Sequence, residues 1–249
     1  MIHIVVPAFE EEGTVGLLLW KIRRLMAEFG RDYRIYVADD ASTDGTSEVL
    51  ERYRRLLPLR ILKNEERMGY ARTLEALLRT AVDEAEYPKR DVVVTLQADF
   101  SEDPADIVPM IKAVEGGADL VAGAPQEGRG PVPRRVRLTR WIATRLLGWP
   151  PAGASAGDPL CGLRAYRVIV VKKALREMGD KPLLTAHGWA ANVQLLERLA
   201  PHARRVKEEP TNLRYDLHPR TSRHAVFRTL KDVLALRGSL SWGHEGKAA

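Results

Sequence analysis

Hydrophobic and polar residues alternate along the first half of this chain in blocks typical of strands followed by helices. Short apolar runs predict β-strands at residues 2–6, 35–38, 60–62, 92–96 and 120–122. Apolar residues that recur at helical spacing predict helices over residues 14–29, 46–57, 70–84 and 104–114. Because strands and helices alternate, the pattern predicts an α/β fold with a mostly parallel sheet flanked by helices.

Beyond residue 123 the pattern changes. Residues 124–135 are rich in Gly, Pro and Arg, and a connection of that length indicates a functional or disordered loop. A second flexible stretch covers residues 150–157. The periodicity then predicts helices over 136–147, 168–178, 189–199 and 224–236, and a strand over 203–208.

These changes divide the chain into three parts. We expect residues 1–123 to form a ligand-binding α/β half, residues 124–236 to form an elaboration of the same domain, and residues 237–249 to form a polar tail. The helix over 136–147 places arginines among Leu, Trp and Ile side chains. Such a basic amphipathic helix either binds phosphate or a headgroup surface, or presents an ordinary solvated face.

The composition limits the possible partners and cellular location of the protein. The chain has 249 residues and one cysteine, so it can bury a full core but cannot form an internal disulfide. Its formal charge of +6 favours anionic partners. No apolar run is long enough to cross a bilayer, and the N-terminal apolar run is interpreted as a strand instead of a signal peptide. We therefore expect a cytoplasmic protein, with peripheral membrane contact compatible with its charge.

Two adjacent carboxylates, Asp39 and Asp40, end the second predicted strand. Open α/β sheets bind ligands at the carboxyl ends of their strands, so this pair is a candidate for the base or ribose of a nucleotide. The alternative is a capped helix start, which accounts for residues 42–46 but less easily for the paired aspartates. Asp103, directly before Pro104, is interpreted as a helix N-cap only.

Four segments together resemble family 2 glycosyltransferases of the GT-A fold. Residues 5–12 (V-V-P-A-F-E-E-E) resemble the family's opening strand and loop, and residues 39–46 (D-D-A-S-T-D-G-T) match its D-D-x-S-x-D-G-T signature. Residues 96–104 (L-Q-A-D-F-S-E-D-P) resemble its D-x-D segment, and residues 158–167 (D-P-L-C-G-L-R-A-Y-R) its D-x-x-S-G-F-R-x-Y motif. Among family members, the resemblance is greatest to dolichol-phosphate and polyprenyl-phosphate mannosyl- or glucosyltransferases.

The resemblance implies a Rossmann-like GT-A sheet with a C-terminal acceptor-side elaboration, and it implies roles for particular residues. Asp39 is expected to contact the base. The whole set expected to bind the nucleotide-sugar is Pro7, Phe9, Glu11, Asp39, Asp40, Ala98, Asp99, Arg135 and Arg220. A Mg²⁺ or Mn²⁺ ion is expected at Asp99, Gln97 and Ser101. The expected catalytic residues are Asp99, Asp158 and Arg164.

Three departures from the family pattern matter. Gln97 replaces the first aspartate of D-x-D, which removes one anionic ligand and leaves metal dependence open. Cys161 replaces a Ser or Thr before Gly162. Residues 216–223 resemble the family's H-x-x-R-x-x-G-x-S-K loop but lack its glycine and lysine. Asp158 has two interpretations, a general base or a residue that holds Arg164 in place.

The expected function is transfer of a hexose, mannose or glucose, from a GDP- or UDP-sugar to a polyprenyl or dolichyl phosphate, by inverting displacement. Two alternatives keep the fold: transfer to a soluble sugar or small-molecule acceptor, and nucleotide-sugar binding without catalysis. A nucleotidyltransferase is disfavoured, because the loop after the first strand is acidic instead of Gly-rich and basic. We expect no nucleic-acid partner.

Overall fold

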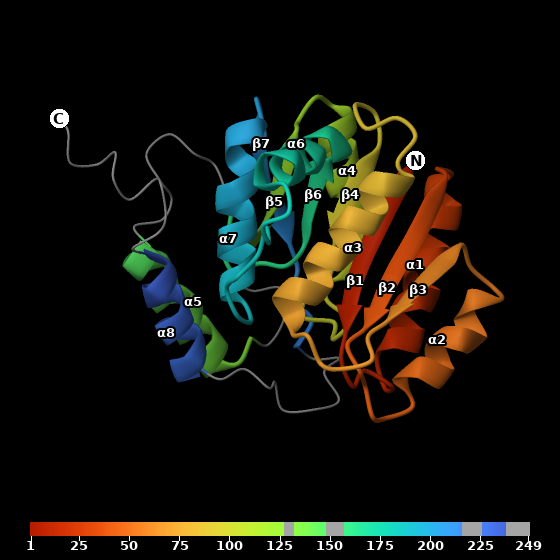
Figure 1. Cartoon of the computed structure of the whole chain (residues 1–249), viewed down its shortest axis with the longest axis horizontal. Coiled ribbons are helices and arrows are strands. Elements are labelled where there is room, and N and C mark those ends of the chain that lie inside the picture. The colour runs from red at the N-terminus through yellow and green to blue at the C-terminus, as the bar shows by residue number, and fades with distance from the viewer. Residues whose placement is uncertain (127–131, 148–156, 216–225, 238–249) are drawn as a thin grey trace.

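A seven-stranded sheet with helices on both faces forms the molecule (Figure 1). The computed structural model describes residues 1–126, 132–147, 157–215 and 226–237. Its strands are β1 (Ile2–Ala8), β2 (Tyr33–Asp39), β3 (Leu59–Lys63), β4 (Val92–Thr95), β5 (Leu120–Pro125), β6 (Arg164–Arg167) and β7 (Val206–Thr211). Its α-helices are α1 (Val15–Phe29), α2 (Thr46–Arg54), α3 (Tyr70–Glu84), α4 (Ile107–Glu115), α5 (Arg134–Leu147), α6 (Val168–Met178), α7 (Ala190–Leu199) and α8 (Val226–Arg237). Short 3₁₀ turns, η1 (Pro104–Asp106) and η2 (Ala200–His202), precede α4 and follow α7.

The strand order is β3-β2-β1-β4-β6-β5-β7, and the first four strands in this order are parallel. β6 runs antiparallel to both β4 and β5, while β7 is parallel to β5. The prediction of a mostly parallel α/β sheet is confirmed. β6 was not predicted as a strand, because its sequence, R-A-Y-R, has no apolar run. It is buried by its two neighbouring strands and by α4 and α6.

Element boundaries differ from the predictions by up to three residues, and two of these differences have a clear structural reason. α2 ends at Arg54, three residues early, since Pro58 disfavours helical geometry in the residue before it. β7 spans Val206–Thr211 where a strand over 203–208 was expected. Its register is set by pairing with β5, from Leu120 opposite Val206 onward.

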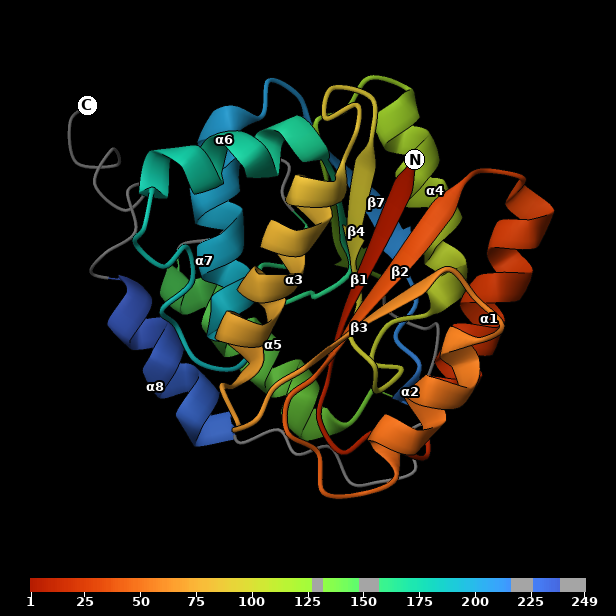
Figure 2. The same cartoon turned by 45° about the vertical axis from the view of Figure 1, so that its right-hand side comes forward.

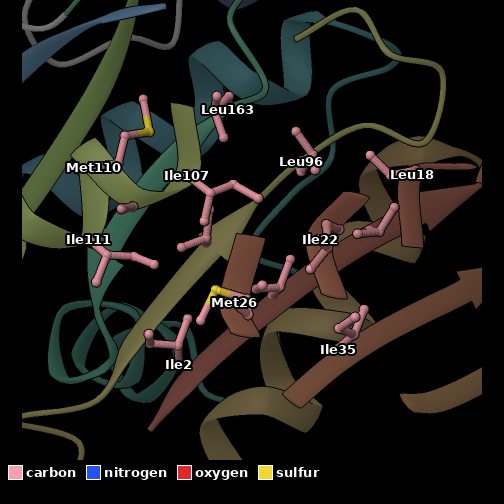
Figure 3. Packing of buried hydrophobic residues seen from close by; sticks show 14 of the residues in the cluster. Ile2, Leu18, Ile22, Met26, Ile35, Leu96, Ile107, Met110, Ile111 and Leu163 are labelled. Atoms are coloured by element: carbon pink, nitrogen blue, oxygen red, sulfur yellow. The ribbon is translucent and has the colours of Figure 1, made fainter. Parts of the chain in front are cut away.

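Helices cover both faces of the sheet (Figure 2), and an apolar core lies on each face. One packs α1, α2 and α4 against the sheet, and Figure 3 shows Ile22 and Met26 of α1 among the side chains of this core. α1 is helical over this surface because its buried residues recur at spacings of three and four. The other core packs α3, α6 and α7.

The α5–α8 pair lies side by side at one end of the molecule, beyond α7 (Figure 1). A third apolar cluster joins these helices to α7, through Ala143 and Leu147 of α5, Val193 of α7, and Val233 and Leu236 of α8. Most of the two predicted flexible segments, 124–135 and 150–157, lies outside the described residues. Among the helices that the structure describes, none combines the length and apolar composition of a bilayer-spanning segment.

Among the described residues, three that are not glycine have left-handed backbone geometry: Glu10 (φ 52°), Ala41 (φ 57°) and Phe100 (φ 60°). Each lies in the loop that leaves the carboxyl end of a central strand, β1, β2 or β4. This geometry is costly for residues with a Cβ, and it gathers at functional sites. The three loops therefore make this edge of the sheet the candidate functional site.

We expect Ala41→Gly to stabilise the fold. Left-handed geometry costs an L-residue roughly 1–2 kcal/mol, and the added flexibility of glycine offsets about half of that gain, leaving about 0.5–1 kcal/mol. Urea unfolding followed by circular dichroism measures the difference. Ala76→Gly, inside α3, is the matched control and should lose about 1 kcal/mol. Equal losses for both variants would contradict a strained Ala41.

Candidate nucleotide-sugar site

A pocket opens between the carboxyl ends of the neighbouring strands β1 and β4. The strand order reverses at this point, because β2 and β3 lie on one side of β1 and β4 lies on the other. Its volume is about 180 Å³, smaller than the roughly 300 Å³ of typical ligand pockets, so it is too small to enclose a whole nucleotide-sugar. It is lined by Pro7, Ala8, Phe9, Glu11, Asp40, Arg67, Tyr70, Thr73, Gln97, Ala98 and Asp99. Six of the residues expected to bind nucleotide-sugar are among them.

Phe9 and Arg67 form a flat surface on this pocket. The guanidinium carbon of Arg67 lies 3.9 Å from the centroid of the Phe9 ring, in cation–π geometry. Sequence reasoning found Phe9 but missed Arg67, which stands in a charged run, K-N-E-E-R, with no motif of its own. A planar guanidinium over a ring offers stacking and hydrogen bonds to a base, and positive charge to a phosphate.

The paired aspartates have separate positions. Asp40 lines the pocket, and its carboxylate accepts hydrogen bonds from Asn64 Nδ2, Met68 N and Gly69 N at 2.8–2.9 Å. Asp39 is fully buried beneath the turn, where it accepts from the Ser42 amide and the Ser47 hydroxyl. Asp40 therefore lines the pocket, while Asp39 shapes the adjacent turn, and the expectation that Asp39 contacts the base stays a prediction.

The other signature residues tie two loops together. The Ser42 hydroxyl accepts from the Glu10 amide, and the Thr46 hydroxyl accepts from the Glu11 amide, both at 2.8 Å. The N-cap residue of α2, Gly45, has no side chain to cap the helix, but the Asp44 carboxylate accepts from the Thr46 amide at 3.1 Å. The capped-helix interpretation of residues 42–46 thus holds for Asp44, while the hydroxyls of Ser42 and Thr46 hold the loop after β1 against the loop after β2.

Asp99 and Gln97 lie beside each other at the end of β4 and line the pocket. The Ser101 hydroxyl donates to Asp99 Oδ1 at 2.6 Å and is fully buried, so Ser101 orients Asp99 instead of facing a metal ion as expected. Among the described residues no group of three or more His, Cys, Asp or Glu is placed to hold a metal. One carboxylate and an amide oxygen still suit Mg²⁺ or Mn²⁺, which take oxygen ligands and complete their shells with substrate phosphates and water.

Glu102 is a buried carboxylate that sequence reasoning missed. Its Oε1 accepts from the Gly162 amide at 2.9 Å and lies 3.5 Å from Gln97 Nε2, and its Oε2 has no hydrogen-bond partner. Burial, and secondarily the negative charge of Asp99, raise the pKa of Glu102 to about 7. A Cβ at Gly162 would come within 2.8 Å of Gln97 Nε2 and 3.2 Å of Glu102 Oε1, so a larger residue there would displace these two side chains.

Asp158 and Arg164 lie behind the pocket and not in its lining. Asp158 is paired with the buried guanidinium of Arg140 on α5, and its other oxygen accepts from the Leu160 amide at 2.7 Å. Burial lowers the pKa of Arg140, but Asp158, together with Tyr215, Cys161 and Glu102, raises this pKa by more, so the net shift is upward. Arg140 also lies over Trp189, with 5.5 Å between the guanidinium carbon and the ring centroid.

Arg164 is almost fully buried, and its guanidinium donates to main-chain carbonyls of Asp158, Pro159 and Asn192. The interpretation that Asp158 holds Arg164 through its side chain is therefore corrected, because the Asp158 carboxylate holds Arg140. Arg164 instead fixes the main chain around Asp158, so it is placed as a positioning residue.

The remaining candidates are less central. Arg135 is exposed on α5 and does not line the pocket, and Arg220 lies outside the described residues. Asp103 is confirmed as an N-cap, since its carboxylate accepts from the Ala105 amide at 3.0 Å. Burial, and then Glu102, raise the pKa of the Cys161 thiol to about 12, which suits a packing residue.

The sheet order and the pocket between β1 and β4 are those of an α/β protein of the GT-A type. A family model described as "Glycosyl transferase family 2" matches residues 3–198. The chain belongs to this family, as the four motifs indicated.

Similar proteins include a dodecaprenyl-phosphate galacturonate synthase from Rhizobium johnstonii, 27% identical over 205 residues, covering 81% of this chain and 57% of the relative. Another is an undecaprenyl-phosphate 4-deoxy-4-formamido-L-arabinose transferase from Pseudomonas aeruginosa, 28% identical over 234 residues, covering 87% and 64%. The chain therefore spans less than two thirds of the length of either relative.

Solved structures of similar fold include Mycobacterium tuberculosis glucosyl-3-phosphoglycerate synthase with Mn²⁺, UDP-glucose and phosphoglyceric acid. Its TM-score is 0.60 at 21% identity, covering 96% of this chain and 80% of that chain. S. aureus TarS in complex with UDP has a TM-score of 0.57 at 16% identity, covering 95% and 64%. At these identities the likeness shows the fold alone.

We expect Glu102→Gln to raise stability at neutral pH and not at acidic pH. The folded pKa of about 7 lies above the usual 4.5, so the contribution of the wild-type carboxyl is fully present below pH 4.5 and is lost as the pH rises to 7. Glutamine keeps an oxygen for the Gly162 amide and does not ionise. The advantage of the variant should grow over this window, on the order of 3 kcal/mol at most.

Urea unfolding between pH 4 and 8, with a chelator present, measures this difference. Glu115→Gln is the matched control, because Glu115 forms only an exposed ion pair with Arg31. Its effect should stay within about 0.5 kcal/mol at every pH. A pH-independent effect of Glu102→Gln would contradict a buried carboxyl with a raised pKa.

Proposed function

We propose that this protein transfers a sugar from a nucleotide-sugar to a polyprenyl phosphate. The observation that carries the proposal is the pocket itself, in which Phe9, Asp40 and Asp99 come together from three family motifs. Membership of family 2 supports sugar transfer. The names of the two curated relatives, both prenyl-phosphate sugar transferases, support a lipid phosphate acceptor.

The donor would enter with its base against Phe9 and Arg67. The Asp40 carboxylate accepts hydrogen bonds from three donors of the protein, so its position on the pocket wall is fixed. A ribose or base can donate a further hydrogen bond to this carboxylate. The diphosphate would then extend toward Asp99 and Gln97 at the end of β4. These two residues would hold Mg²⁺ or Mn²⁺, which when bound neutralises negative charge on the leaving diphosphate.

The acceptor side favours a phosphate over a hydroxyl. In the proposed step an anionic oxygen of the acceptor phosphate bonds to the anomeric carbon. The bond from that carbon to the diphosphate oxygen breaks, and the nucleoside diphosphate leaves with the electron pair. An ionised phosphate needs no general base, so positioning and charge stabilisation carry the reaction.

The Asp158 carboxylate is the base that a hydroxyl acceptor would need. Both of its oxygens are occupied, one by Arg140 and one by the Leu160 amide, so neither is placed to remove a proton. This observation supports the lipid phosphate over a soluble hydroxyl acceptor. A hexose donor, mannose or glucose with GDP or UDP, stays part of the proposal.

The test is transfer of radiolabelled sugar from GDP- and UDP-sugars to polyprenyl phosphate, with Mg²⁺ or Mn²⁺. Asp99→Asn should lower kcat on the order of 100-fold, because it removes the one carboxylate that would hold the metal ion against the diphosphate. Asp103→Asn is the matched control in the same segment. It retains an oxygen for the Ala105 amide and should leave the rate near wild type.

Three results would overturn the proposal. One is the absence of transfer from every GDP- and UDP-sugar tried. Another is transfer to a soluble hydroxyl acceptor in preference to the lipid phosphate. The third is equal activity of Asp99→Asn and wild type.

A further inference from the structure

The α5–α8 pair combines apolar exposure with positive charge. Four of the ten large hydrophobic residues that are exposed in the described chain lie on these two short helices. They are Leu138 (54% exposed), Trp141 (54%), Phe227 (90%) and Leu234 (50%). On most protein surfaces such side chains occur singly, so their concentration on α5 and α8 indicates an interaction surface.

On α5 five of the six exposed residues form one stripe, with the sixth, Arg135, at its edge, and the buried residues form another stripe. The exposed stripe is Arg134, Arg137, Leu138, Trp141 and Arg145. These positions recur at spacings of three and four, so they share one helix face. The guanidinium carbon of Arg145 lies 4.6 Å from the Trp141 ring centroid, which holds charge and aromatic surface together.

On α8 the pattern repeats. Phe227, Lys231 and Leu234 are exposed and share a face, while Val233 and Leu236 are buried against α5 and α7. Phe227 has almost none of its surface covered by the protein. An aromatic ring in this position gains most by entering a nonpolar phase.

The charges on this pair are nearly all of one sign. α5 carries five arginines and no acidic residue, and α8 carries three basic residues and one aspartate. One of the arginines, Arg140, forms a buried ion pair with Asp158 and does not contribute to the exposed charge. The others surround the exposed Leu, Trp and Phe side chains, an arrangement that matches an anionic lipid surface in both charge and polarity.

We propose that the exposed faces of α5 and α8 dock on an anionic lipid bilayer, with Trp141 and Phe227 entering the headgroup region and the arginines contacting lipid phosphates. The proposal rests on the proposed function, since it says how the protein would reach a lipid-linked acceptor. It also connects the surface to the site, because Arg140 on the buried face of α5 holds Asp158.

Vesicle co-sedimentation of the full chain tests the proposal, with phosphatidylcholine alone and with phosphatidylcholine mixed with phosphatidylglycerol. Wild type should bind the anionic vesicles and not the neutral ones. The pair Trp141→Ser with Phe227→Ser should weaken binding about ten-fold or more. Arg134→Glu with Arg137→Glu should abolish it.

Trp20→Ser is the matched control, because Trp20 on α1 is 46% exposed and also lies under an arginine, Arg24. It should bind vesicles like wild type. Thermal unfolding of each variant establishes that it is folded. Absence of wild-type binding, unchanged binding of the Trp141/Phe227 variant, or an equal loss in Trp20→Ser would overturn the proposal.

A soluble short-chain prenyl phosphate separates this proposal from the proposed function. Transfer to it should be unaffected by the Trp141/Phe227 change, because these residues lie away from the pocket. Vesicle binding without transfer to any prenyl phosphate would overturn the proposed function alone. Transfer to the soluble acceptor without wild-type vesicle binding would overturn the docking proposal alone.

Discussion

The parallel pairing of β1 with both β2 and β4 is the constraint on which the site depends. Because all three strands run the same way, their carboxyl ends meet at one edge, and the loops that follow must share that edge. Each loop contains one left-handed residue, Glu10, Ala41 or Phe100, so each turns sharply at its strand end. The pocket lies between these turns and inherits its shape from them.

Charged residues in this molecule mostly hold the main chain in place. Asp40 anchors the loop before α3, Arg164 fixes the segment around Asp158, and Arg140 fastens α5 to that segment. Buried charges are tolerated only when hydrogen-bonded partners surround them, and main-chain groups supply most of those partners here. The result is a firm frame around the smaller group of residues that face a ligand.

α5 links the two proposals. Its buried face presents Arg140 to Asp158 at the acceptor side, and its exposed face presents Trp141 and its arginines to the exterior. If the exposed face meets a lipid surface, the acceptor side is held close to that surface by the same helix. A lipid phosphate would then reach the site without leaving the bilayer interface entirely.

The amino-acid sequence by itself determined the family and the order of most elements, since hydrophobic period and strand-end motifs are local properties. It placed Pro7, Phe9 and Asp99 in one cleft through a family resemblance. The tertiary structure decided which of two adjacent aspartates reaches the pocket, because neighbouring side chains on a strand point to opposite faces. It also decided the partners of Glu102 and Asp158, which come from segments 60 and 18 residues away along the chain. Such long-range contacts leave no periodic trace in sequence, so only the packed sheet and α5 could define them.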